Sequence, residues 1–484
     1  MSKIISISPF NRVEGDLKIK VKIEDGRVAD ARASGTMFRG FEQILKGHFP
    51  EDAIIYTPRI CGICSISHSI ASSNALAAIS EAFVPSKNGQ LAKNISHATE
   101  NAMSHITQFY VYFAPDLLNH KHAHLKYYPF VEKRLAQLKG ESAKIVITER
   151  KRFLEILGLI GGKWPHTLAI QPGGITKSLG SSDIFRIHGI LKQFSSVVES
   201  VLLGMPAEDY LKIRSVSDFD SAFSGEGNPS SDLGLFYRFA DEAGLITMGK
   251  GPGRFISGGC YPETDGTPYI PSGYLNGKAS NISMEKITES IHYSFFDAPK
   301  SSSNPAFDTS LPKWDKPNAY SWAKAPRYNG EVVEVGAIAR QLISGDPLIA
   351  DFFSMYGSTV FTRVLARLHE AVKLLQKMSG WIEQLDANES YFVRNTLKER
   401  TSGIGITEAA RGILGHWINV DGGRITNYQV ITPTGWNASP RDENETPGAL
   451  EQALINTTIE DEGNPVEIDH IIRSYDPCLV CTVH

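Results

Sequence analysis

The sequence predicts an α+β fold that is predominantly helical, with a central bundle of long helices, an N-terminal β-hairpin and a late β-hairpin. Three observations predict this class. Apolar residues repeat with helical spacing in the middle of the chain, alternate with polar residues near its start, and flank a glycine-containing turn late in the chain. The chain has 484 residues, 42% of them hydrophobic, and can therefore bury a large core. This length alone is typical of two or three domains.

The first element is a β-hairpin near the N-terminus. Apolar residues alternate with polar ones at Leu17, Ile19, Val21 and Ile23. A period of two places these side chains on one face of a strand. Asp25-Gly26 then offers a two-residue turn into a second strand around Val28.

Long helices are predicted for the middle of the chain. The segment from about Leu91 to Phe113 has helical spacing. After Ser181 and Ser182, an apolar stripe of helical period follows at Ile184, Ile187, Ile190, Leu191, Phe194, Val197, Val198 and Val201. A further stripe has the same spacing at Val360, Phe361, Val364, Leu365, Leu368, Val372 and Leu375. We expect these helices to form the central bundle.

A late β-hairpin follows the helices. Apolar residues at 417–420 and at Ile425 flank the turn sequence Asp-Gly-Gly at 421–423. Residues 432–447 are rich in turn-forming residues, which predicts turns there.

Charge and hydropathy exclude several classes of protein. The chain carries 49 basic and 53 acidic residues, so no global basic field attracts nucleic acid or an anionic membrane. No run approaches the roughly 18 apolar residues of a membrane span, and residues 1–9 lack the pattern of an export signal. The sequence therefore predicts no nucleic-acid partner and no membrane span, and the cytoplasm is the default location.

Four of the five cysteines form two Cys-x-x-Cys pairs. Cys61 and Cys64 lie near the start, and Cys478 and Cys481 lie in the last seven residues. Four thiolates favour a soft metal, and a structural zinc site is one reading. Zinc ribbons usually space their pairs by about 15 to 20 residues, whereas here the spacing is 478 − 64 = 414 positions. Zinc would also close all four positions, whereas nickel or iron can keep one open for a substrate.

The residues around the cysteines resemble the large subunit of nickel-iron hydrogenases. The resemblance rests on the motifs Arg-x-Cys-Gly-x-Cys at 59–64, followed by His68, and Asp-Pro-Cys-x-x-Cys-x-x-His at 476–484. It extends to residues 12–15, 38–42, 408–412 and 433–437, and so spans essentially the whole chain. The resemblance implies one catalytic domain over residues 1–484, with both chain ends converging on the metal site.

The resemblance implies a binuclear centre. Cys61 and Cys478 would be terminal nickel ligands, and Cys64 and Cys481 would bridge nickel to an iron that carries carbon monoxide and cyanides. Thiolates suit this centre because polarizable sulfur can bridge two metals. The implied chemistry is heterolytic cleavage of dihydrogen, which requires a metal to accept hydride and a base, taken to be Cys478, to accept the proton.

Further residues receive roles from the resemblance. Glu14 would accept the proton next, and Arg411 and Thr434 would donate hydrogen bonds to the cyanides. His68 would donate to a bridging sulfur. Without the resemblance, Glu14 would be interpreted as a solubilising glutamate, Arg411 as a surface arginine and His68 as a core histidine. Glu42 and the terminal His484 would bind a magnesium ion that holds the buried C-terminus.

The resemblance also implies partners. Once four cysteines hold the centre, only Cys260 is left, so the iron-sulfur clusters that remove electrons would lie in a small subunit. The expected assembly is a heterodimer, or a dimer of heterodimers. Export in the family can follow a signal on the small subunit. Family members are often processed after the terminal histidine with the help of maturation proteins, and His484 matches a processed or a tailless member.

Two other functions stay open at this point. A regulatory subunit could use the same site to sense hydrogen and signal to a kinase. The other alternative is a non-enzymatic scaffold, because a related subunit of respiratory Complex I shares the fold, although that subunit lacks the cysteine pairs present here.

Ala410 and Ser104 depart from the residues that most members carry near the metals. Bulky Ile63 and Tyr112 match hydrogen-sensing relatives, which motivates the hypothesis of a narrowed gas channel and resistance to oxygen.

Some residues are set aside. His120, His122 and His124 alternate as metal ligands on a strand could, but their polar segment predicts a solvated loop. The glycines at 249, 251 and 253 form no full dinucleotide-binding motif. Cys260 is expected to be a structural or free thiol.

Overall fold

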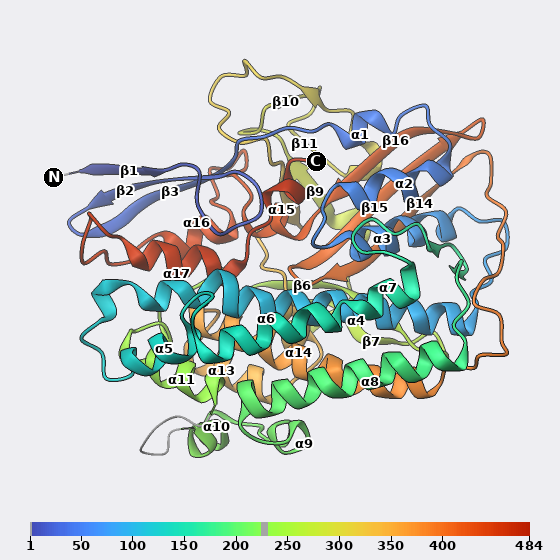
Figure 1. Cartoon of the computed structure of the whole chain (residues 1–484). Coiled ribbons are helices and arrows are strands. Elements are labelled where there is room, and N and C mark those ends of the chain that lie inside the picture. Colours follow the sequence, from blue (N-terminus) through green and yellow to red (C-terminus); the bar gives the residue numbers. More distant parts are fainter. Residues whose placement is uncertain (1, 224–230) are drawn as a thin grey trace.

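The computed structural model describes residues 2–223 and 231–484. Long helices form one half of the molecule, and the sheets and the C-terminal helices form the other half (Figure 1). The predicted α+β fold with a large helical part is therefore confirmed.

The N-terminal sheet has three antiparallel strands, β1 Lys3–Ile7, β2 Leu17–Glu24 and β3 Arg27–Gly35. The four alternating apolar residues of β2, predicted to share a face, are all buried. The predicted hairpin is confirmed as β2 and β3. The sequence analysis did not identify β1, which pairs with the other edge of β2.

The helical bundle is centred on α14, Val360–Glu383, which packs against α4, Lys87–Thr107, and α8, Ser181–Val197. Both α4 and α8 continue into π-helical turns, at Gln108–Phe113 and Val198–Leu203. All three predicted helices are therefore confirmed. In α14 a Thr359 side chain caps the N-terminus by accepting from Thr362 N.

The late hairpin is part of a three-stranded antiparallel sheet of β14 Thr401–Ala409, β15 Gly412–Asp421 and β16 Arg424–Ile431. This sheet packs on α3, Ser65–Ala78. The approach is close, because a Cβ atom on Gly405 would lie 2.0 Å from Ala71 O. Since α3 begins next to the first cysteine pair, the sheet fixes the helix that carries the pair.

The sequence analysis predicted no element between residues 255 and 328, and this segment holds several short strands. They are β6 Phe255–Pro262, β7 Pro268–Asn276, β8 Lys278–Ser280, β9 Ile287–Ser290, β10 Phe296–Asp297, β11 Ser302–Ser303, β12 Leu311–Pro312 and β13 Ala325–Tyr328. Two further short strands, β4 Ile170–Gln171 and β5 Gly174–Ile175, form a small hairpin.

The remaining helices are mostly short. Those before the middle of the chain are α1 Phe41–Ile44, α2 Ala53–Tyr56, α5 Tyr128–Leu135, α6 Glu141–Phe153, α7 Glu155–Gly161, α9 Ala207–Tyr210, α10 Val216–Phe223 and α11 Asp232–Glu242. Those after it are α12 Ala337–Ile343, α13 Pro347–Tyr356, α15 Pro433–Asn437, α16 Ala449–Leu454, α17 Val466–Tyr475 and α18 Leu479–Thr482. α15 lies in the segment 432–447, for which only turns were predicted.

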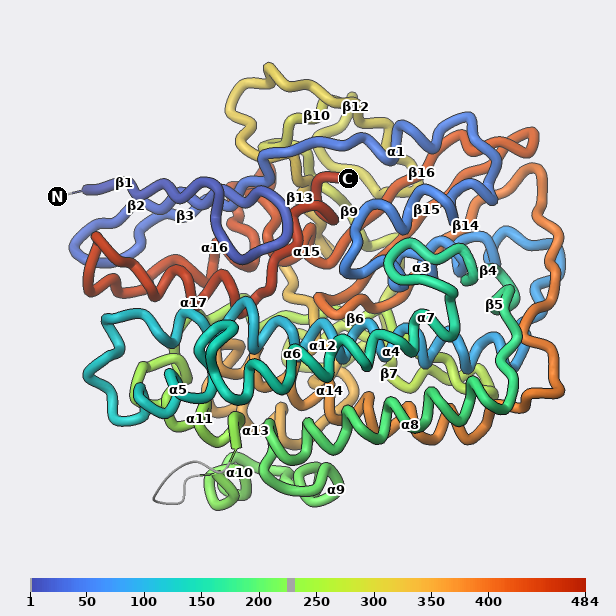
Figure 2. The backbone as a smooth tube through the Cα atoms, viewed as in Figure 1, coloured from blue at the N-terminus to red at the C-terminus, as the bar shows by residue number. Residues whose placement is uncertain are grey.

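The C-terminal segment lies inside the molecule, beside the N-terminal segment (Figure 2). Glu14 and Cys478 form a parallel β-bridge, and Leu479 N donates to Glu14 O at 2.6 Å. The two ends of the chain are therefore joined through their backbones. Among the residues that the structure describes, no helix is both long and apolar enough to cross a membrane.

The prediction of a solvated loop at residues 120–124 is wrong for one of its histidines. His122 was expected in a solvated segment, but it is buried and its Nε2 lies 3.0 Å from Nε2 of His470 in α17. His120 and His122 lie in a 3-10 turn, and His124 is exposed as expected. The error arose because a polar local sequence does not show that a distant helix covers one of its side chains.

Candidate metal centre

The two cysteine pairs meet in the interior. The distance between Sγ atoms is 3.5 Å for Cys61 and Cys478, 3.2 Å for Cys64 and Cys481, and 3.1 Å for Cys478 and Cys481. All four side chains are buried, each at most 4% exposed. The long spacing in sequence thus becomes a single cluster of thiols.

The sulfur atoms form two overlapping ligand groups. The Sγ atoms of Cys61, Cys478 and Cys481 lie within 4.8 Å of one another, and so do the ligand atoms of Cys64, His68 and Cys481. Burial disfavours the thiolate of Cys61, but hydrogen bonds from the other three thiols lower its pKa well below the ordinary value. Thiolate is the form of cysteine that binds metals.

Arg39 ties the two cysteine motifs together. Its guanidinium donates to Ile60 O at 2.5 Å and to Val480 O at 3.2 Å, so one side chain bonds the backbone beside each pair. A second nitrogen donates to Arg59 O at 2.8 Å. The sequence analysis assigned no role to Arg39, because its acceptors are backbone atoms that only the fold brings together.

Gly15 allows the two chain ends to approach. It adopts a φ of +82°, and a Cβ atom there would lie 2.7 Å from Val480 N. Real Cβ atoms do not come this close to backbone, so any side chain would push the C-terminal segment away.

We expect Gly15→Ala to destabilise the protein much more than Gly26→Ala. Both glycines have positive φ, which strains a residue with Cβ by ~1–2 kcal/mol, but Gly26 has nothing within 4 Å of the added atom. The clash at Gly15 adds a further cost, typically ~1–3 kcal/mol. Thermal unfolding of the two variants measures the difference, and equal losses of stability would contradict the close approach.

Asp476 directs the C-terminal pair into the cluster. Arg411 donates from Nε to Asp476 O at 2.8 Å and lies 3.1 Å from the carboxylate, while Arg367 approaches the same carboxylate at 3.3 Å. Arg411 is buried, which lowers its pKa, but Asp476 and the cysteine sulfurs raise that pKa well above the ordinary value. Its Nη1 has no hydrogen-bond partner among the described residues, so one donor of a buried cation stays available beside the thiols.

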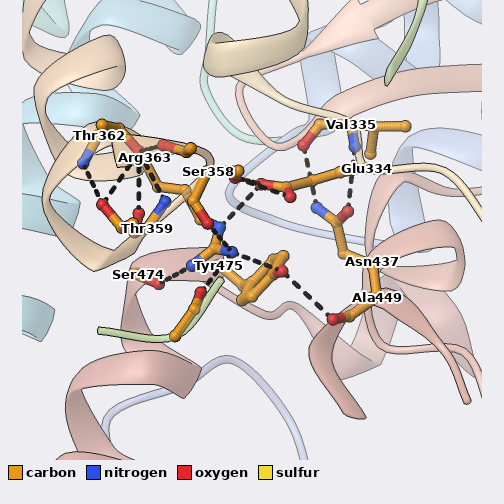
Figure 3. A network of polar contacts seen from close by, with 12 residues as sticks. Glu334, Val335, Ser358, Thr359, Thr362, Arg363, Asn437, Ala449, Ser474 and Tyr475 are labelled. Atoms are coloured by element: carbon orange, nitrogen blue, oxygen red, sulfur yellow. Dashed lines mark hydrogen bonds and ion pairs between the residues drawn. The ribbon is translucent and has the colours of Figure 1, made fainter. Parts of the chain in front are cut away.

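Arg363 holds the end of α17, directly before Asp476 (Figure 3). It bonds Glu334 Oε1 at 2.8 Å and Tyr475 Oη at 2.8 Å, and its guanidinium carbon lies 3.9 Å from the centre of the Tyr475 ring. In the same network Asn437 exchanges two hydrogen bonds of 3.1 Å with the backbone of Val335. α14, α15 and α17 are thereby fixed relative to one another.

The remaining predicted residues lie around the cluster. Thr434 Oγ1 accepts from Cys478 N at 3.0 Å. Glu14 is partly buried, and burial together with the charge of Cys61 raises its pKa. His68 Nδ1 lies 3.2 Å from Nε2 of His416, and burial lowers the pKa of His68 to about 3, so the imidazole is neutral. The plainer reading of Arg411 as a surface arginine is wrong.

A second polar cluster lies where the chain ends. Glu42 Oε1 is 3.3 Å from Nε2 of His484, and Glu42 Oε2 is 3.2 Å from Nζ of Lys324. Lys324 also bonds Asp308 at 2.7 Å and approaches Glu289 at 3.8 Å. Burial alone would raise the pKa of Glu42, but Lys324 and His484 lower it to about 2. Burial raises the pKa of Glu289 to about 8, and Oε2 of Glu289 has no hydrogen-bond partner in residues 2–223 and 231–484.

The other residues named in the sequence analysis take less part. Ile63 packs against the cysteine cluster, and Tyr112 O accepts from Arg12 at 2.9 Å. Cys260 is buried in β6 and forms no disulfide.

Comparison with known proteins covers the whole chain. A family model described as nickel-dependent hydrogenase matches residues 39–152 and 145–484. The periplasmic [NiFeSe] hydrogenase large subunit of Desulfomicrobium baculatum is 31% identical over 522 residues, covering 99% of this chain and 94% of the relative. The uptake hydrogenase large subunit of Rhodobacter capsulatus is 28% identical and covers 100% and 95%. The solved Ni-Fe-Se hydrogenase of D. vulgaris Hildenborough in the reduced state superposes with a TM-score of 0.85 at 30% identity over 100% of both chains.

Proposed function

Because this chain belongs to the nickel-dependent hydrogenase family, we propose that it oxidises dihydrogen at a nickel-iron centre held by Cys61, Cys64, Cys478 and Cys481. The family and its large-subunit fold agree with the prediction from the sequence, and the chain is an oxidoreductase. The observation that carries the proposal is the burial of two Cys-x-x-Cys pairs in one cluster. We further propose that residues 1–484 form a single catalytic domain.

The ligand groups suit two metals better than one. Cys481 belongs to both groups of ligand atoms, as a sulfur that bridges two ions would. Cys64 would be the other bridge, and Cys61 and Cys478 would be terminal ligands of nickel. A single tetrahedral zinc ion would need all four sulfurs in one group.

The surroundings of the cluster fit anionic diatomic ligands on iron. Arg411 offers a buried donor, Nη1, that has no acceptor among the described residues. Thr434 keeps a hydroxyl hydrogen because its oxygen acts as an acceptor for Cys478 N. We assign both side chains to two cyanides, with carbon monoxide as a third ligand of iron. When bound, the centre supplies heterolytic cleavage of dihydrogen.

Proton transfer is assigned to Cys478 and Glu14. The thiolate of Cys478 is the first base, and Glu14, whose backbone is bonded to the Cys478 segment, takes the proton next. Burial and the charge of Cys61 raise the pKa of Glu14, which suits a group that must both accept and release a proton. We assign His68 to a hydrogen bond with a bridging sulfur, because its other ring nitrogen is taken by His416.

We assign a magnesium ion to Glu42 and His484. The ionised carboxylates of Glu42 and Asp308 outnumber the single ammonium of Lys324, so a divalent cation would balance the buried charge, and it would also favour ionisation of Glu289. Oε2 of Glu289 lies 3.8 Å from Nζ of Lys324 but accepts no hydrogen bond from the described residues. This supports the fit, since a buried carboxylate oxygen needs a cation or a donor. The ion would hold the C-terminal segment, and with it Cys481, in place.

We expect removal of Mg²⁺ by a chelator to lower the midpoint of thermal unfolding. At 100 times its Kd, a bound ion stabilises the folded state by about 2.7 kcal/mol. Glu42→Gln should abolish the effect of chelation, whereas Glu51→Gln, at an exposed acidic residue, should keep it. A full chelator effect in Glu42→Gln, with nickel retained in both samples, would contradict the assignment.

The relatives are large subunits, and we propose a small subunit with iron-sulfur clusters as the partner of this chain. It would form a heterodimer, or a dimer of heterodimers, and would carry the electrons away because Cys260 alone cannot bind a cluster. Exposed apolar residues precede the first cysteine pair in the sequence and suit such an interface: Met37, Ile44, Phe49 and Ile55. Co-purification under mild conditions tests this partner.

The hydrogen-sensing role stays a second candidate, supported by Ile63 packed against the cysteines. A sensor would bind the same metals but show slow turnover and associate with a kinase. We propose a cytoplasmic location and assembly by maturation proteins. The D. baculatum relative is named periplasmic, so cell fractionation, with the small subunit present, would test the location.

Metal analysis with infrared spectroscopy tests the proposed function. One nickel and one iron per chain, together with carbonyl and cyanide bands between the protein and water absorptions, would support it. Zinc without such bands would mean a structural zinc-thiolate protein instead.

A further inference from the structure

The first cysteine pair lies at the start of α3, where backbone donors need partners. The first N–H groups of a helix have no acceptor within the helix, and the side chain of the N-cap residue usually accepts from the second or third of them. The N-cap of α3 is Cys64, and its side chain makes no capping hydrogen bond. Its sulfur instead faces Cys481 at 3.2 Å. The first N–H groups of α3 must therefore find another acceptor.

Glu100, from the middle of α4, supplies the missing cap. Its Oε2 accepts from Ile66 N at 2.8 Å, and its Oε1 accepts from Ser67 N at 2.9 Å. These are the second and third residues of α3. Oε1 also accepts from Ser67 Oγ at 2.9 Å, and Oε2 accepts from Nε1 of Trp164 at 3.0 Å. Each carboxylate oxygen therefore has two donors.

The four donors around Glu100 favour a fixed carboxylate, whereas burial opposes its charge. The side chain is fully buried and its four partners are all donors, so the geometry suits a charged acceptor. Burial raises the pKa of Glu100 to about 7, while the four hydrogen bonds lower it. The carboxylate also lies at the positive end of the α3 dipole, where a negative charge is stabilised.

We propose that Glu100 is a positioning residue of the metal centre, which caps α3 where the Cys64 side chain does not and so holds the start of this helix, and with it the Cys64 sulfur, beside the other thiols. This inference rests on the proposed function. Glu100 touches none of the four cysteines in the hydrogen bonds described. It acts through the backbone of Ile66 and Ser67, and its charge offsets the positive end of α3 beside the sulfur.

The matched control for Glu100 is Glu451. Glu451 is also fully buried, and burial raises its pKa to about 7. It likewise accepts two backbone hydrogen bonds, from Ala33 N at 2.9 Å and from Gly448 N at 3.2 Å. None of its described hydrogen bonds involves the residues that follow Cys64. Substitution of either glutamate therefore removes a buried carboxylate that accepts backbone hydrogen bonds, but only Glu100 is bonded to α3.

The test compares Glu100→Gln with Glu451→Gln in the purified, metal-loaded protein. The amide offers one acceptor fewer and no charge, so amide hydrogen exchange at Ile66 and Ser67 should become roughly tenfold faster or more in Glu100→Gln. The carbonyl band of iron should move to higher wavenumber, since less negative charge remains near the sulfur. Glu451→Gln should leave both readouts at the wild-type value.

A second variant keeps the test decisive if Glu100→Gln does not fold. Trp164→Phe removes one donor from Oε2 at a partly exposed position. Because this hydrogen bond lowers the pKa of Glu100, its loss favours the protonated carboxyl and should move the carbonyl band to higher wavenumber, in the same direction as Glu100→Gln. Unmoved bands in both Glu100→Gln and Trp164→Phe, or equal shifts in Glu100→Gln and Glu451→Gln, would overturn the role of Glu100. A wild-type protein without carbonyl bands would overturn the proposed function as well.

Discussion

Cys481→Ala is expected to remove both metals and to lower hydrogen oxidation by more than about 100-fold, beyond the loss typical of residues that only orient a ligand. Cys481 belongs to both groups of ligand atoms, and its Sγ lies 3.1 Å from Cys478 and 3.2 Å from Cys64. Loss of this one sulfur would therefore open both halves of the centre. Metal content per chain and hydrogen uptake with an artificial acceptor measure the effect.

The fifth cysteine provides the control for this prediction. Cys260 is also buried, at 5% exposed, but lies in β6, outside the cluster of the other four cysteines. Cys260→Ala should keep nickel, iron and most of the activity, with a modest loss of stability from the small cavity. Retention of both metals in Cys481→Ala, or their loss in Cys260→Ala, would show that the ligand set is assigned wrongly.

Glu14→Gln is expected to lower hydrogen oxidation by about 10²–10⁴-fold, the usual contribution of a positioned acid or base, while metal content and infrared bands stay unchanged. Glutamine keeps the shape of the side chain but cannot accept the proton. Because burial and the charge of Cys61 raise the pKa of Glu14, the wild-type rate should fall with decreasing pH already above the ordinary range of a glutamate. The pH profile of the residual rate in the variant should lack this acidic limb.

Asp16 is the natural comparison for Glu14. It is an exposed carboxylate two residues away, so Asp16→Asn changes the local charge equally without removing the partly buried group. We expect Asp16→Asn to keep the wild-type rate and pH profile. A Glu14→Gln variant with full activity would require another proton acceptor, whereas one that loses its metals would show a structural role instead.

Elements with a clear local pattern could be predicted from the sequence. The alternation of β2 and the apolar stripes of α8 and α14 could be recognised from their period alone. Most strands between residues 255 and 328 are only two to four residues long, which is too short to show such a pattern. β1 was missed because much of it is exposed, so it has little apolar periodicity.

Some residues of the candidate site could likewise be identified from the sequence, and others could not. The four cysteines could be identified from the sequence because paired thiols are rare and chemically distinctive. The family motifs then also pointed to Glu14, Arg411 and His484. Arg39, Arg367 and Glu100 could not be chosen, because ordinary charged residues gain their importance from backbone atoms and carboxylates far away in sequence. His122 was misjudged for the same reason, since its partner, His470, is 470 − 122 = 348 positions later.

The backbone bridge between Glu14 and Cys478 has a consequence for the order of events during synthesis. A ribosome releases Cys61 and Cys64 long before Cys478 and Cys481, so the nascent chain holds half of the ligands with no counterpart. When Cys61 and Cys64 leave the ribosome, the backbone bridge between Glu14 and Cys478 has not yet formed. Metal bound by all four cysteines, as proposed, would close a loop of more than four hundred residues and would hold it closed against the chain entropy that favours reopening.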